Sequence, residues 1–395
     1  MKHVLSISTL YPNASNPRFG TFVARSLEAL AARGDWRVTC INPIGLPPIA
    51  LGRYRALSEL PATSEEAGIV IHRPRFTLIP RIGARRNAAA IAKAVLPLAQ
   101  QIHASEPIDV VDAQFFFPDG PAAATVAKAL GVPLSIKARG SDITYWGKQD
   151  FAREQMLDAA SKASGLLSVS ADLAGHMAQM GMPKDRISLH YTGLDRDRFR
   201  PLNHTQLRGQ LSKELGFDLP DNTPLLVCVG ALIPRKGQAI ALDALAQLAE
   251  ARLVLVGKGE DREALEAQAQ TLGIADRVLF AGSLDHDMLP LILSAADAMV
   301  LPTDNEGLAN AWVEALACGT PVVTCDVGGA RELITDDIAG RLLTERTADA
   351  VVEAVRAVLN NPPLRADVAA FAERFSWENN AAELAAHFER LASGA

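Results

Sequence analysis

Residues 298–326 read AMVLPTDNEGLANAWVEALACGTPVVTCD. The runs at the two ends, AMVLPT and PVVTCD, are apolar, which is typical of strands buried on both faces. Between them the pattern predicts a loop that carries Glu306, followed by a helix from about Asn310. The helix should end at Gly319, because a glycine followed by a proline is a helix stop signal. Strand, helix and strand in this order predict one βαβ unit of a parallel sheet.

The same alternation of apolar runs and helix-like segments extends over most of the chain. One series of candidate strands starts at residues 3, 37, 108, 133, 165 and 186, and a second at residues 225, 252, 277, 298 and 321. The polar segment TGLDRDRFRPLNHT, residues 192–205, separates the series and predicts a domain boundary near residue 200. We expect an α/β protein of two facing, Rossmann-like doubly wound domains, residues 1–199 and 200–375, and a C-terminal helix, residues 376–395. Ligands should bind in the cleft at the carboxyl ends of both sheets.

Composition excludes several classes of function. A length of 395 residues is too long for one ordinary core, and the net charge of −6 gives no basic field for nucleic acid. The four cysteines are scattered without metal-ligand spacing, which indicates buried thiols in a reducing compartment. The chain starts with MKHVLSIS, a candidate strand without a leader pattern, so we expect a cytoplasmic protein. No metal and no cofactor are expected.

Two motifs suggest other ligands. GKGEDR, residues 257–262, follows a strand and opens a helix, but Arg262 stands where a dinucleotide fingerprint needs its third glycine. The acidic pairs DRD at 195–197 and DHD at 285–287 have the residue types of a metal site. Their charged surroundings favour solvated turns instead.

Glu306 and Glu314 pose the main question about function. If all eight steps between them were helical, they would be ~12 Å apart at a rise of about 1.5 Å per residue. That distance suits a sugar, a diphosphate and a ribose, and the helix N-terminus between them suits phosphate. The alternative is that Glu314 lies at the edge of the core and pairs with an arginine. Since an unpaired buried carboxylate costs several kcal/mol, we expect a partner in either case.

A second candidate site is VGALIPRKGQ, residues 229–238, where Arg235 and Lys236 follow a predicted strand. Arginine can bind an oxyanion through two N–H groups, and lysine adds a mobile point charge. Together they suit a leaving diphosphate. By itself, the motif is also compatible with a solvated loop tip.

These motifs together carry a resemblance. EGLANAWVEALACGTPVVTCDVGGARELI and VGALIPRKGQ resemble the E-x7-E element and the paired-basic phosphate loop of the family 4 glycosyltransferases, retaining enzymes with the GT-B fold. STLYPNASNPRFGTFVARSLEAL and FFFPDGPAAATVAKALGVPLSIKARGSDI resemble members that build exopolysaccharides or teichuronic-acid-like polymers. TGLDRDRF resembles the interdomain NGVD..RF of the family. The resemblance covers nearly the whole chain and implies that the C-terminal helix crosses back to the first domain.

The resemblance implies roles for individual residues. Arg235 and Lys236 would hold the donor diphosphate and stabilise the departing charge, and Glu314 would bind the ribose hydroxyls. Glu306 would face the transferred sugar, together with backbone N–H groups of Gly307 and Leu308. The catalytic residues would thus be Arg235, Lys236 and Glu306. The donor would be a nucleoside-diphosphate sugar, with UDP or GDP as the nucleotide. Gly20, in the first domain, would let the backbone approach the diphosphate.

The acceptor side departs from the family pattern. Related members often read HAH before the PDG loop, where this chain has Asp112, Ala113 and Gln114. A histidine often assigned to the acceptor side is therefore absent. This leaves four candidates for acceptor contact, namely Asp112, Gln114, Asp119 and Asp142. The resemblance implies a saccharide acceptor that is linked to a lipid.

A basic segment in the first domain has no acidic residue between Ala67 and Ser105. Its cations are Arg73, Arg75, Arg81, Arg85, Arg86 and Lys93, and apolar residues lie among them. The segment predicts docking on an anionic membrane surface or on a lipid-pyrophosphate acceptor, which would place the protein at the inner face of the membrane. A solvated helix face with arginine stems over apolar surface is the alternative.

Two other functions are compatible with the predicted fold. An epimerase or hydrolase of nucleotide sugars would turn over the donor without an acceptor. A two-domain sugar-binding protein would bind a sugar without transferring it. The basic loop at Arg235 and Lys236 argues against the binding protein.

Overall fold

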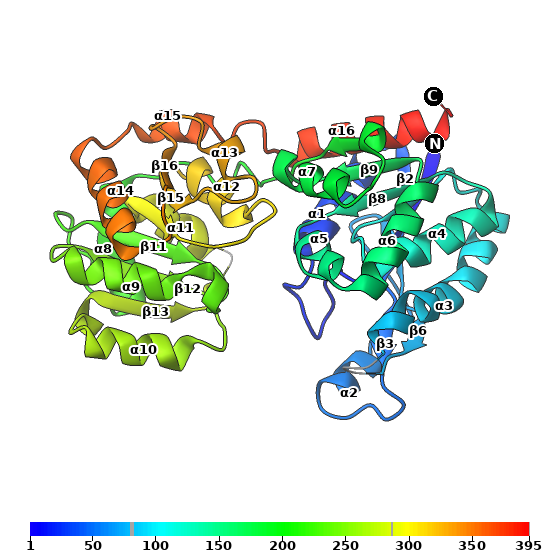
Figure 1. Cartoon of the computed structure of the whole chain (residues 1–395), viewed down its shortest axis with the longest axis horizontal. Helices are drawn as coiled ribbons and strands as arrows, with labels where there is room; N and C mark the ends of the chain where they lie inside the picture. Colours follow the sequence, from blue (N-terminus) through cyan, green and yellow to red (C-terminus); the bar gives the residue numbers. More distant parts are fainter. Residues whose placement is uncertain (80–82, 286, 395) are drawn as a thin grey trace. The chain divides into compact units, whose positions relative to one another are not determined.

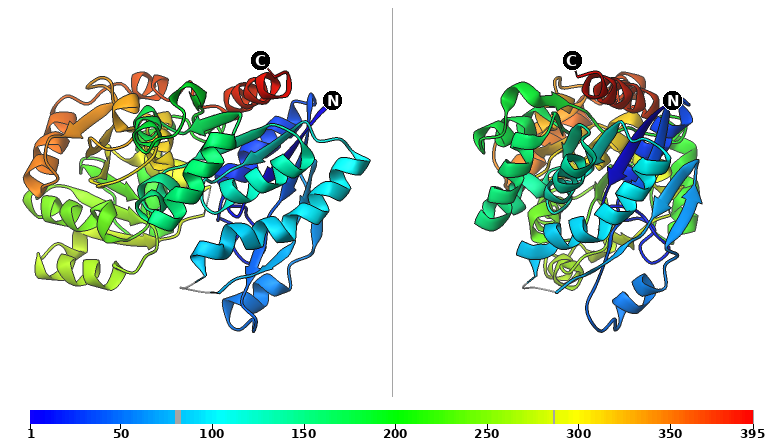
Figure 2. Two further views of the ribbon diagram at one scale, coloured as in Figure 1. Left: turned by 45° about the vertical axis from the view of Figure 1, so that its right-hand side comes forward. Right: turned by 90° about the vertical axis from the view of Figure 1, so that its right-hand side faces the viewer.

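A computed structural model describes residues 1–79, 83–285 and 287–394. It divides into two compact units (Figures 1 and 2). Unit 1 comprises Met1–Gly193 and Trp377–Ala395, and unit 2 comprises Leu194–Ser376. Each unit is an α/β structure built on its own sheet, which is parallel in unit 2 and parallel except for one edge pair in unit 1.

Unit 1 contains an eight-stranded sheet in the order β10-β9-β8-β7-β1-β2-β5-β4. Its strands are β1 (Lys2–Ile7), β2 (Trp36–Ile41), β4 (Thr63–Glu66), β5 (Ile69–His72), β7 (Val110–Ala113), β8 (Leu134–Ala138), β9 (Gly165–Ser168) and β10 (Ile187–Leu189). All neighbours pair in parallel except β4 and β5, which are antiparallel. The six strands predicted for this half are present, and all but the edge strand β10 have mostly buried side chains.

The helices of unit 1 connect these strands. They are α1 (Thr21–Ala32), α2 (Arg53–Ser58), α3 (Ala84–Ser105), α4 (Asp119–Leu130), α5 (Ser141–Thr144), α6 (Asp150–Lys162), α7 (Ala171–Gln179) and α16 (Trp377–Ala392). Short 3₁₀ turns lie at Trp146–Lys148 and Lys184–Arg186. Two further short strands, β3 (Ile44–Leu46) and β6 (Arg75–Thr77), form a separate parallel pair, and α2 packs on β3.

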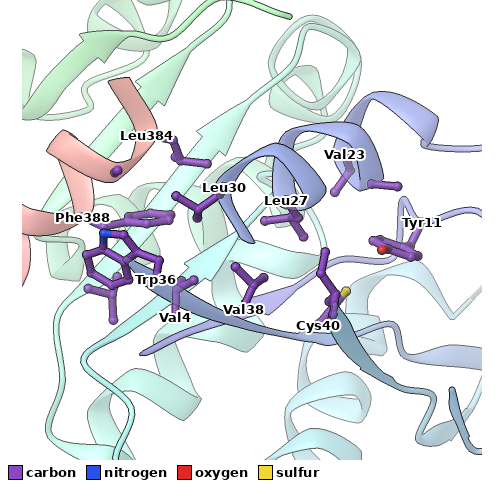
Figure 3. Packing of buried hydrophobic residues seen from close by; sticks show 14 of the residues in the cluster. Val4, Tyr11, Val23, Leu27, Leu30, Trp36, Val38, Cys40, Leu384 and Phe388 are labelled. Atoms are coloured by element: carbon purple, nitrogen blue, oxygen red, sulfur yellow. The ribbon is translucent and has the colours of Figure 1, made fainter. Parts of the chain in front are cut away.

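The C-terminal helix returns to unit 1, as predicted. Figure 3 shows Leu384 and Phe388 of α16 in one apolar cluster with Leu30 of α1 and Trp36 of β2. The rings of Trp36 and Phe388 meet edge to face with centroids 5.6 Å apart. This burial of large apolar side chains holds the helix on the sheet.

A buried polar residue fixes the position of α16 as well. The side chain of Asn380 accepts a hydrogen bond from the Ser26 hydroxyl at 2.7 Å and donates one to the Tyr191 carbonyl at 2.6 Å. His190, just after β10, hydrogen-bonds with the Asn380 carbonyl at 2.9 Å. Because buried polar groups need partners, this network fixes the position of α16 on the sheet.

Unit 2 contains a six-stranded parallel sheet in the order β13-β12-β11-β14-β15-β16. Its strands are β11 (Leu225–Val229), β12 (Arg252–Val256), β13 (Val278–Gly282), β14 (Ala298–Leu301), β15 (Val322–Cys325) and β16 (Gly340–Leu343). Its helices are α8 (His204–Leu215), α9 (Gln238–Gln247), α10 (Arg262–Thr271), α11 (Met288–Ala295), α12 (Asn310–Ala317), α13 (Ala330–Leu333), α14 (Ala348–Asn360) and α15 (Arg365–Ala370), with 3₁₀ turns η3 (Pro234–Lys236) and η4 (Ala275–Arg277).

The strand order of unit 2 decides where a ligand can bind. The chain runs outward from β11 to β12 and β13, and then crosses to β14 on the other side of β11. In doubly wound sheets, ligands bind outside the carboxyl ends of the strands at this switch point. The loops after β11 and β14 meet there, and these are the loops that carry Arg235, Lys236 and Glu306.

The glycines of GKGEDR have a packing role in unit 2. A Cβ on Gly257 would overlap the carbonyl oxygen of Gly230, and one on Gly259 would overlap that of Leu232. The loop after β12 therefore lies directly against the loop after β11. This close approach accounts for both glycines without a dinucleotide.

Candidate functional site

The loop after β11 presents two cations at the switch point of unit 2. Arg235 and Lys236 lie in the 3₁₀ turn η3, directly before α9. The Arg235 side chain is well exposed, whereas the Lys236 side chain is only 12% exposed. A lysine ammonium that is largely buried needs a counter-charge.

Glu306 supplies that counter-charge from the loop after β14. Its carboxylate forms an ion pair with the Lys236 ammonium, and the Arg235 guanidinium lies 3.4 Å away. The Thr303 hydroxyl donates a hydrogen bond to the same carboxylate oxygen at 3.1 Å. Two cations and one anion leave this cluster with a net positive charge. Such a cluster can attract a phosphate and still hold its own side chains in place.

The two loops are also joined through their backbones. The N–H of Asp304 donates to the Arg235 carbonyl at 2.9 Å, and the Arg235 guanidinium donates to the Asn305 carbonyl at 2.6 Å. Arg346 connects the loops from a third segment, since its guanidinium donates to the Pro302 carbonyl at 2.8 Å and to the Pro234 carbonyl at 3.0 Å. The cation loop and the Glu306 loop are therefore held as one piece.

Gly328 packs directly against the backbone of Glu306. It has a φ of +55°, and a Cβ there would overlap the Glu306 carbonyl oxygen. The N–H of the next residue, Gly329, donates to the Gly307 carbonyl at 2.8 Å. A side chain at position 328 would push the Glu306–Gly307 peptide out of place.

Glu314 lies in α12, which begins at Asn310 as predicted. Its neighbours Trp312, Val313 and Ala315 are buried, and Glu314 itself is half-buried. Burial raises the pKa of the Glu314 carboxyl to about 7. Across the described part of the chain, no protein group forms a hydrogen bond or an ion pair with this carboxylate. The predicted alternative, an arginine partner at the edge of the core, is therefore not found among these residues.

In unit 1, Gly20 lies immediately before α1 with a φ of +74°. A Cβ there would be 2.5 Å from the backbone carbon of Leu10. The glycine thus lets the start of α1 lie against the loop after β1. The contact of Gly20 with a donor diphosphate stays a prediction.

The four predicted acceptor-side residues are all fully buried in unit 1. Asp142 accepts hydrogen bonds from the backbone N–H groups of Phe116, Arg139 and Gly140 at 2.8 to 3.0 Å. Asp119 accepts one from the Thr9 N–H at 2.8 Å, and burial raises the pKa of its carboxyl to about 7. Both carboxylates tie loops together at the carboxyl edge of the sheet.

The other two acceptor-side residues belong to one buried network. Gln114 donates to Asp112 and accepts from Arg139, and the Ser6 hydroxyl donates to Asp112 at 3.1 Å. Burial raises the pKa of the Asp112 carboxyl. Arg139 also lies over the ring of Phe22, with its guanidinium carbon 4.8 Å from the centroid. Direct contact of Asp112, Gln114, Asp119 or Asp142 with an acceptor stays a prediction.

The basic segment divides into buried and exposed cations. The Arg73 side chain is buried and pairs with Glu66 at 3.1 Å, and Arg75 donates to the carbonyls of Ser58 and Leu60. Arg73 therefore connects the end of β5 to β4, which corrects its assignment to a docking surface. Arg75 is exposed on β6, and its part in docking stays a prediction. Arg81 lies outside the described residues. The remaining cations, Arg85, Arg86 and Lys93, are exposed on α3.

The acidic pairs DRD and DHD were considered above as a possible metal site. Within residues 1–79, 83–285 and 287–394, no three His, Cys, Asp or Glu side chains are placed to hold a metal ion. Asp195 accepts from the Arg198 backbone N–H in a local turn, whereas Asp287 pairs with the Arg198 side chain, 89 positions away. Of the helices described, none is long and apolar enough to span a bilayer.

Three positions in the unit 2 site were not predicted from the sequence, namely Thr303, Gly328 and Arg346. Thr303 directly precedes the predicted Glu306 loop, so its contact with Glu306 is local. Arg346 lies far from both loops in the chain, donates to the backbone carbonyls of Pro234, Arg235 and Pro302, and has the Asp304 carboxylate 4.0 Å from its guanidinium. No residue pattern marks such a contact.

Comparison with known families covers both units. The model described as "Glycosyl transferase 4-like domain" matches residues 19–193, and "Glycosyl transferases group 1" matches residues 214–375. Together these matches include most of the chain, and each falls within one structural unit.

Among individual proteins, the chain is 27% identical to "Putative teichuronic acid biosynthesis glycosyltransferase TuaC" of Bacillus subtilis over 361 residues, which is 89% of this chain and 88% of that protein. It is 30% identical to a GDP-mannose-dependent phosphatidylinositol monomannoside mannosyltransferase of Mycolicibacterium smegmatis, over 55% of this chain and 58% of that protein.

Solved structures share the fold over the full length. Sucrose-phosphate synthase from Thermosynechococcus elongatus has a TM-score of 0.80 at 22% identity and covers 100% of both chains. Anabaena HepE in complex with UDP has a TM-score of 0.75 at 22% identity, over 99% of this chain and 100% of that one.

Proposed function

The chain belongs to the family 4 glycosyltransferases with the GT-B fold, and from this premise we propose that it moves a hexose from a nucleoside-diphosphate sugar to a saccharide acceptor with retention of configuration. The acceptor is lipid-linked, and the product is a surface polysaccharide or exopolysaccharide. The observation that carries the proposal is the ion-paired cluster of Arg235, Lys236 and Glu306 at the switch point of unit 2.

In this proposal the two cations hold the donor diphosphate. The Arg235 guanidinium can donate two parallel hydrogen bonds to phosphate oxygens, and the Lys236 ammonium adds a point charge beside them. Negative charge grows on the diphosphate as the bond to the sugar breaks. Cations that are already in place stabilise that charge without reorganisation, which is the largest catalytic effect available to such a site.

Glu314 binds the ribose of the donor. A half-buried carboxylate that has no partner among the residues that the structure describes can accept hydrogen bonds from two neighbouring hydroxyls. Only the ionised carboxylate is a pure acceptor, so ribose binding favours loss of the proton. Nucleotide binding should therefore lower the pKa of Glu314 from about 7.

Glu306 has two roles in the proposal. It holds Lys236 in place, and it faces the transferred sugar together with the backbone N–H groups of Gly307 and Leu308. A carboxylate that accepts from a sugar hydroxyl while it positions a lysine couples donor recognition to the leaving-group site. Gly20 of unit 1 would approach the same diphosphate through its backbone.

The relatives support a substrate class. TuaC is described by its name as a putative glycosyltransferase of teichuronic acid biosynthesis. HepE has been solved with UDP and with UDP-glucose, whereas the mannosyltransferase of Mycolicibacterium smegmatis is named for GDP-mannose. Uridine and guanosine diphosphate sugars are thus the two donor classes to test first.

The direct test is transfer of sugar followed by NMR. The protein is incubated with UDP-glucose, UDP-galactose or GDP-mannose and with lipid-linked saccharides, and the anomeric proton of the new linkage is recorded at early times. The proposal predicts one donor class and an α-linked product from an α-linked donor. Donor turnover without any acceptor would indicate the hydrolase or epimerase instead. Binding of sugar without transfer would indicate the sugar-binding protein.

A second proposal concerns the place of reaction, at the inner face of the cell membrane. Arg85, Arg86 and Lys93 are exposed on α3, and Ile49 and Leu51 in the loop before α2 are each 73% exposed. Exposed cations and apolar side chains in one unit suit an anionic bilayer, in which the apolar groups insert below the headgroups. The test is sedimentation with vesicles that contain an anionic lipid, compared with vesicles of neutral lipid alone. Binding should fall in R85E/R86E and in I49S/L51S, but not in the exposed control R331E of unit 2.

A further inference from the structure

Arg346 lies in the short connection between β16, which ends at Leu343, and α14, which begins at Ala348. The strand holds one end of this connection. At the other end the Thr347 hydroxyl accepts from the Ala350 N–H at 3.3 Å and caps the helix. The backbone of Arg346 is therefore fixed at the carboxyl edge of the unit 2 sheet, beside β16 and α14 in Figure 1. In the sheet, β16 is two strands away from β14 and three from β11.

The side chain of Arg346 reaches from this edge to the cation loop and to the Glu306 loop. Its Nε donates to the Pro302 carbonyl at 2.8 Å. Its Nη2 donates to the carbonyls of Pro234 at 3.0 Å and Arg235 at 3.2 Å. A guanidinium offers five N–H groups in one plane, so a single arginine can serve acceptors from two loops at once.

The three carbonyl oxygens need such a donor because the two loops are packed backbone against backbone. A Cβ on Gly237 would be 2.2 Å from the Pro302 carbonyl oxygen. Carbonyl oxygens that face one guanidinium from both loops carry partial negative charge and repel one another. Each of them also needs a hydrogen-bond partner. Arg346 meets both requirements, and its loss would favour separation of the loops.

The separation of the loops decides where the two cations lie. Lys236 and Arg235 directly follow Pro234, whose carbonyl Arg346 holds. A shift of this backbone would move both cations away from the Glu306 carboxylate. A preorganised electrostatic site loses its advantage when its charges must be repositioned during binding or reaction. Arg346 can thus affect the site through the backbone alone.

The charge of Arg346 could act in a second way, by attracting the diphosphate from a distance. The Asp304 carboxylate lies 4.0 Å from the guanidinium, and both side chains are partly exposed, at 48% and 33%. A pair of this kind is screened by water and contributes little. A lysine at position 346 would keep the charge but could not reproduce the planar set of donors. The two effects can therefore be separated by substitution.

We infer that Arg346 is a positioning residue of the diphosphate site, which holds the cation loop against the Glu306 loop. The inference rests on the proposed glycosyltransferase function. It adds a residue that sets the affinity for the diphosphate without contact with the donor.

The test is calorimetric titration of the full chain with UDP, UMP, GDP and GMP. In R346Q the ratio of diphosphate to monophosphate affinity should fall about tenfold, whereas the affinity for the monophosphate should stay the same. R346K should lose at least about threefold of this ratio, since it keeps only the charge. The matched control is R341Q, because Arg341 lies on β16 and donates to the nearby carbonyls of Asp337 and Gly340. This control should keep the ratio of wild type.

Hydrogen exchange without nucleotide gives a second measurement. Peptides that cover residues 234–238 and 302–306 should exchange faster in R346Q than in wild type and R341Q, with thermal melting as the check on folding. An unchanged affinity ratio in R346Q, or a ratio in R346K equal to that of wild type, would overturn the inference and leave the transferase function in place. Equal losses of UDP and UMP affinity would also overturn it, since they indicate general destabilisation. A wild type that binds neither UDP nor GDP would refute the transferase function and this role with it.

Discussion

Glu306 and Lys236 are 70 positions apart in the chain and form an ion pair at the switch point of the unit 2 sheet. Both side chains are largely buried, at 10% and 12% exposure. Arg235 remains exposed beside them and leaves the cluster with positive charge. This arrangement is the basis of the proposed diphosphate site, because it presents cations that the protein itself does not fully neutralise.

Removal of the Lys236 charge tests the role of that cluster. K236M should lower kcat by about 10²- to 10³-fold, since one preorganised electrostatic donor contributes that much in comparable sites. K236R should restore part of the activity. The measurement is steady-state transfer at saturating donor, with K213M on the exposed face of α8 as the control. Equal losses of kcat in K236M and K213M would contradict the assignment.

The stability of the protein without ligand tests Glu314. Because burial raises the pKa of its carboxyl from 4.5 to about 7, ionisation is penalised only in the folded state. The penalty is absent below about pH 4, grows as the pH rises through 7, and is constant at about 3 kcal/mol from about pH 8. E314Q removes it, so the variant should be more stable than wild type at pH 8 and equally stable at pH 4. Urea unfolding at the two pH values measures the difference.

Nucleotide binding should favour the ionised carboxylate of Glu314, whereas the ligand-free folded protein is more stable when this carboxyl is neutral. E314Q loses the charged acceptor, and its affinity for the nucleotide should fall about tenfold or more. In wild type the affinity should rise with pH up to about 7, as the carboxyl ionises. Calorimetric titration between pH 5.5 and 8 measures both. An affinity that is unchanged in E314Q and constant with pH would remove the ribose contact from the account.

Gly328 tests whether the backbone of the Glu306 loop matters. G328A forces a side chain against the Glu306 carbonyl at a φ of +55°, so we expect kcat to fall at least about tenfold. The substituted residue contacts no substrate in the proposal. G273A, at a similar φ of +68° but with open space around it, controls for backbone strain alone. Equal activity of the two variants would show that the contact is unimportant.

His387 predicts an acid-sensitive attachment of α16. Burial, with the nearby charges of Arg390 and Lys137, lowers the pKa of His387 to about 4. An unfolded histidine has a pKa of about 6.5, so the unfolded state takes up the proton first as the pH falls. The free energy of unfolding should therefore drop by about 3 kcal/mol between pH 7 and pH 4 because of this residue. H387Q should lack this part of the loss, and parallel pH profiles for the two proteins would contradict it.

The predictable part of the fold is the part with a strong burial pattern. All eleven predicted strands were found, and the side chains of nine of them, all but β10 and β13, are mostly buried, which produces continuous apolar runs. The five missed strands are short, at three or four residues each. β4 has the sequence TSEE and lies at the edge of its sheet with polar side chains, so nothing in its composition indicates a strand.

The site was predictable only where its residues lie close together in the chain. The loop before Asn310 and the helix that carries Glu314 follow from glycine and proline signals and from apolar spacing. The pairing of Glu306 with Lys236 depends on the strand order, which sequence patterns do not give. Arg73 was misassigned because a charged residue in an apolar segment looks the same whether it points to solvent or to a buried partner such as Glu66.

The most direct test of the central claim is a thermal-shift panel with UDP, GDP, ADP, NAD and no ligand, with and without magnesium. A ligand at about 100 times its dissociation constant stabilises the folded protein by about 2.7 kcal/mol, which is a readily measured shift. We predict a shift with UDP or GDP that needs no magnesium and is at most about half as large in K236M and in E314Q. A flat response to every nucleoside diphosphate, or an equal shift in wild type and both variants, would contradict the claim that Arg235, Lys236, Glu306 and Glu314 form the donor site.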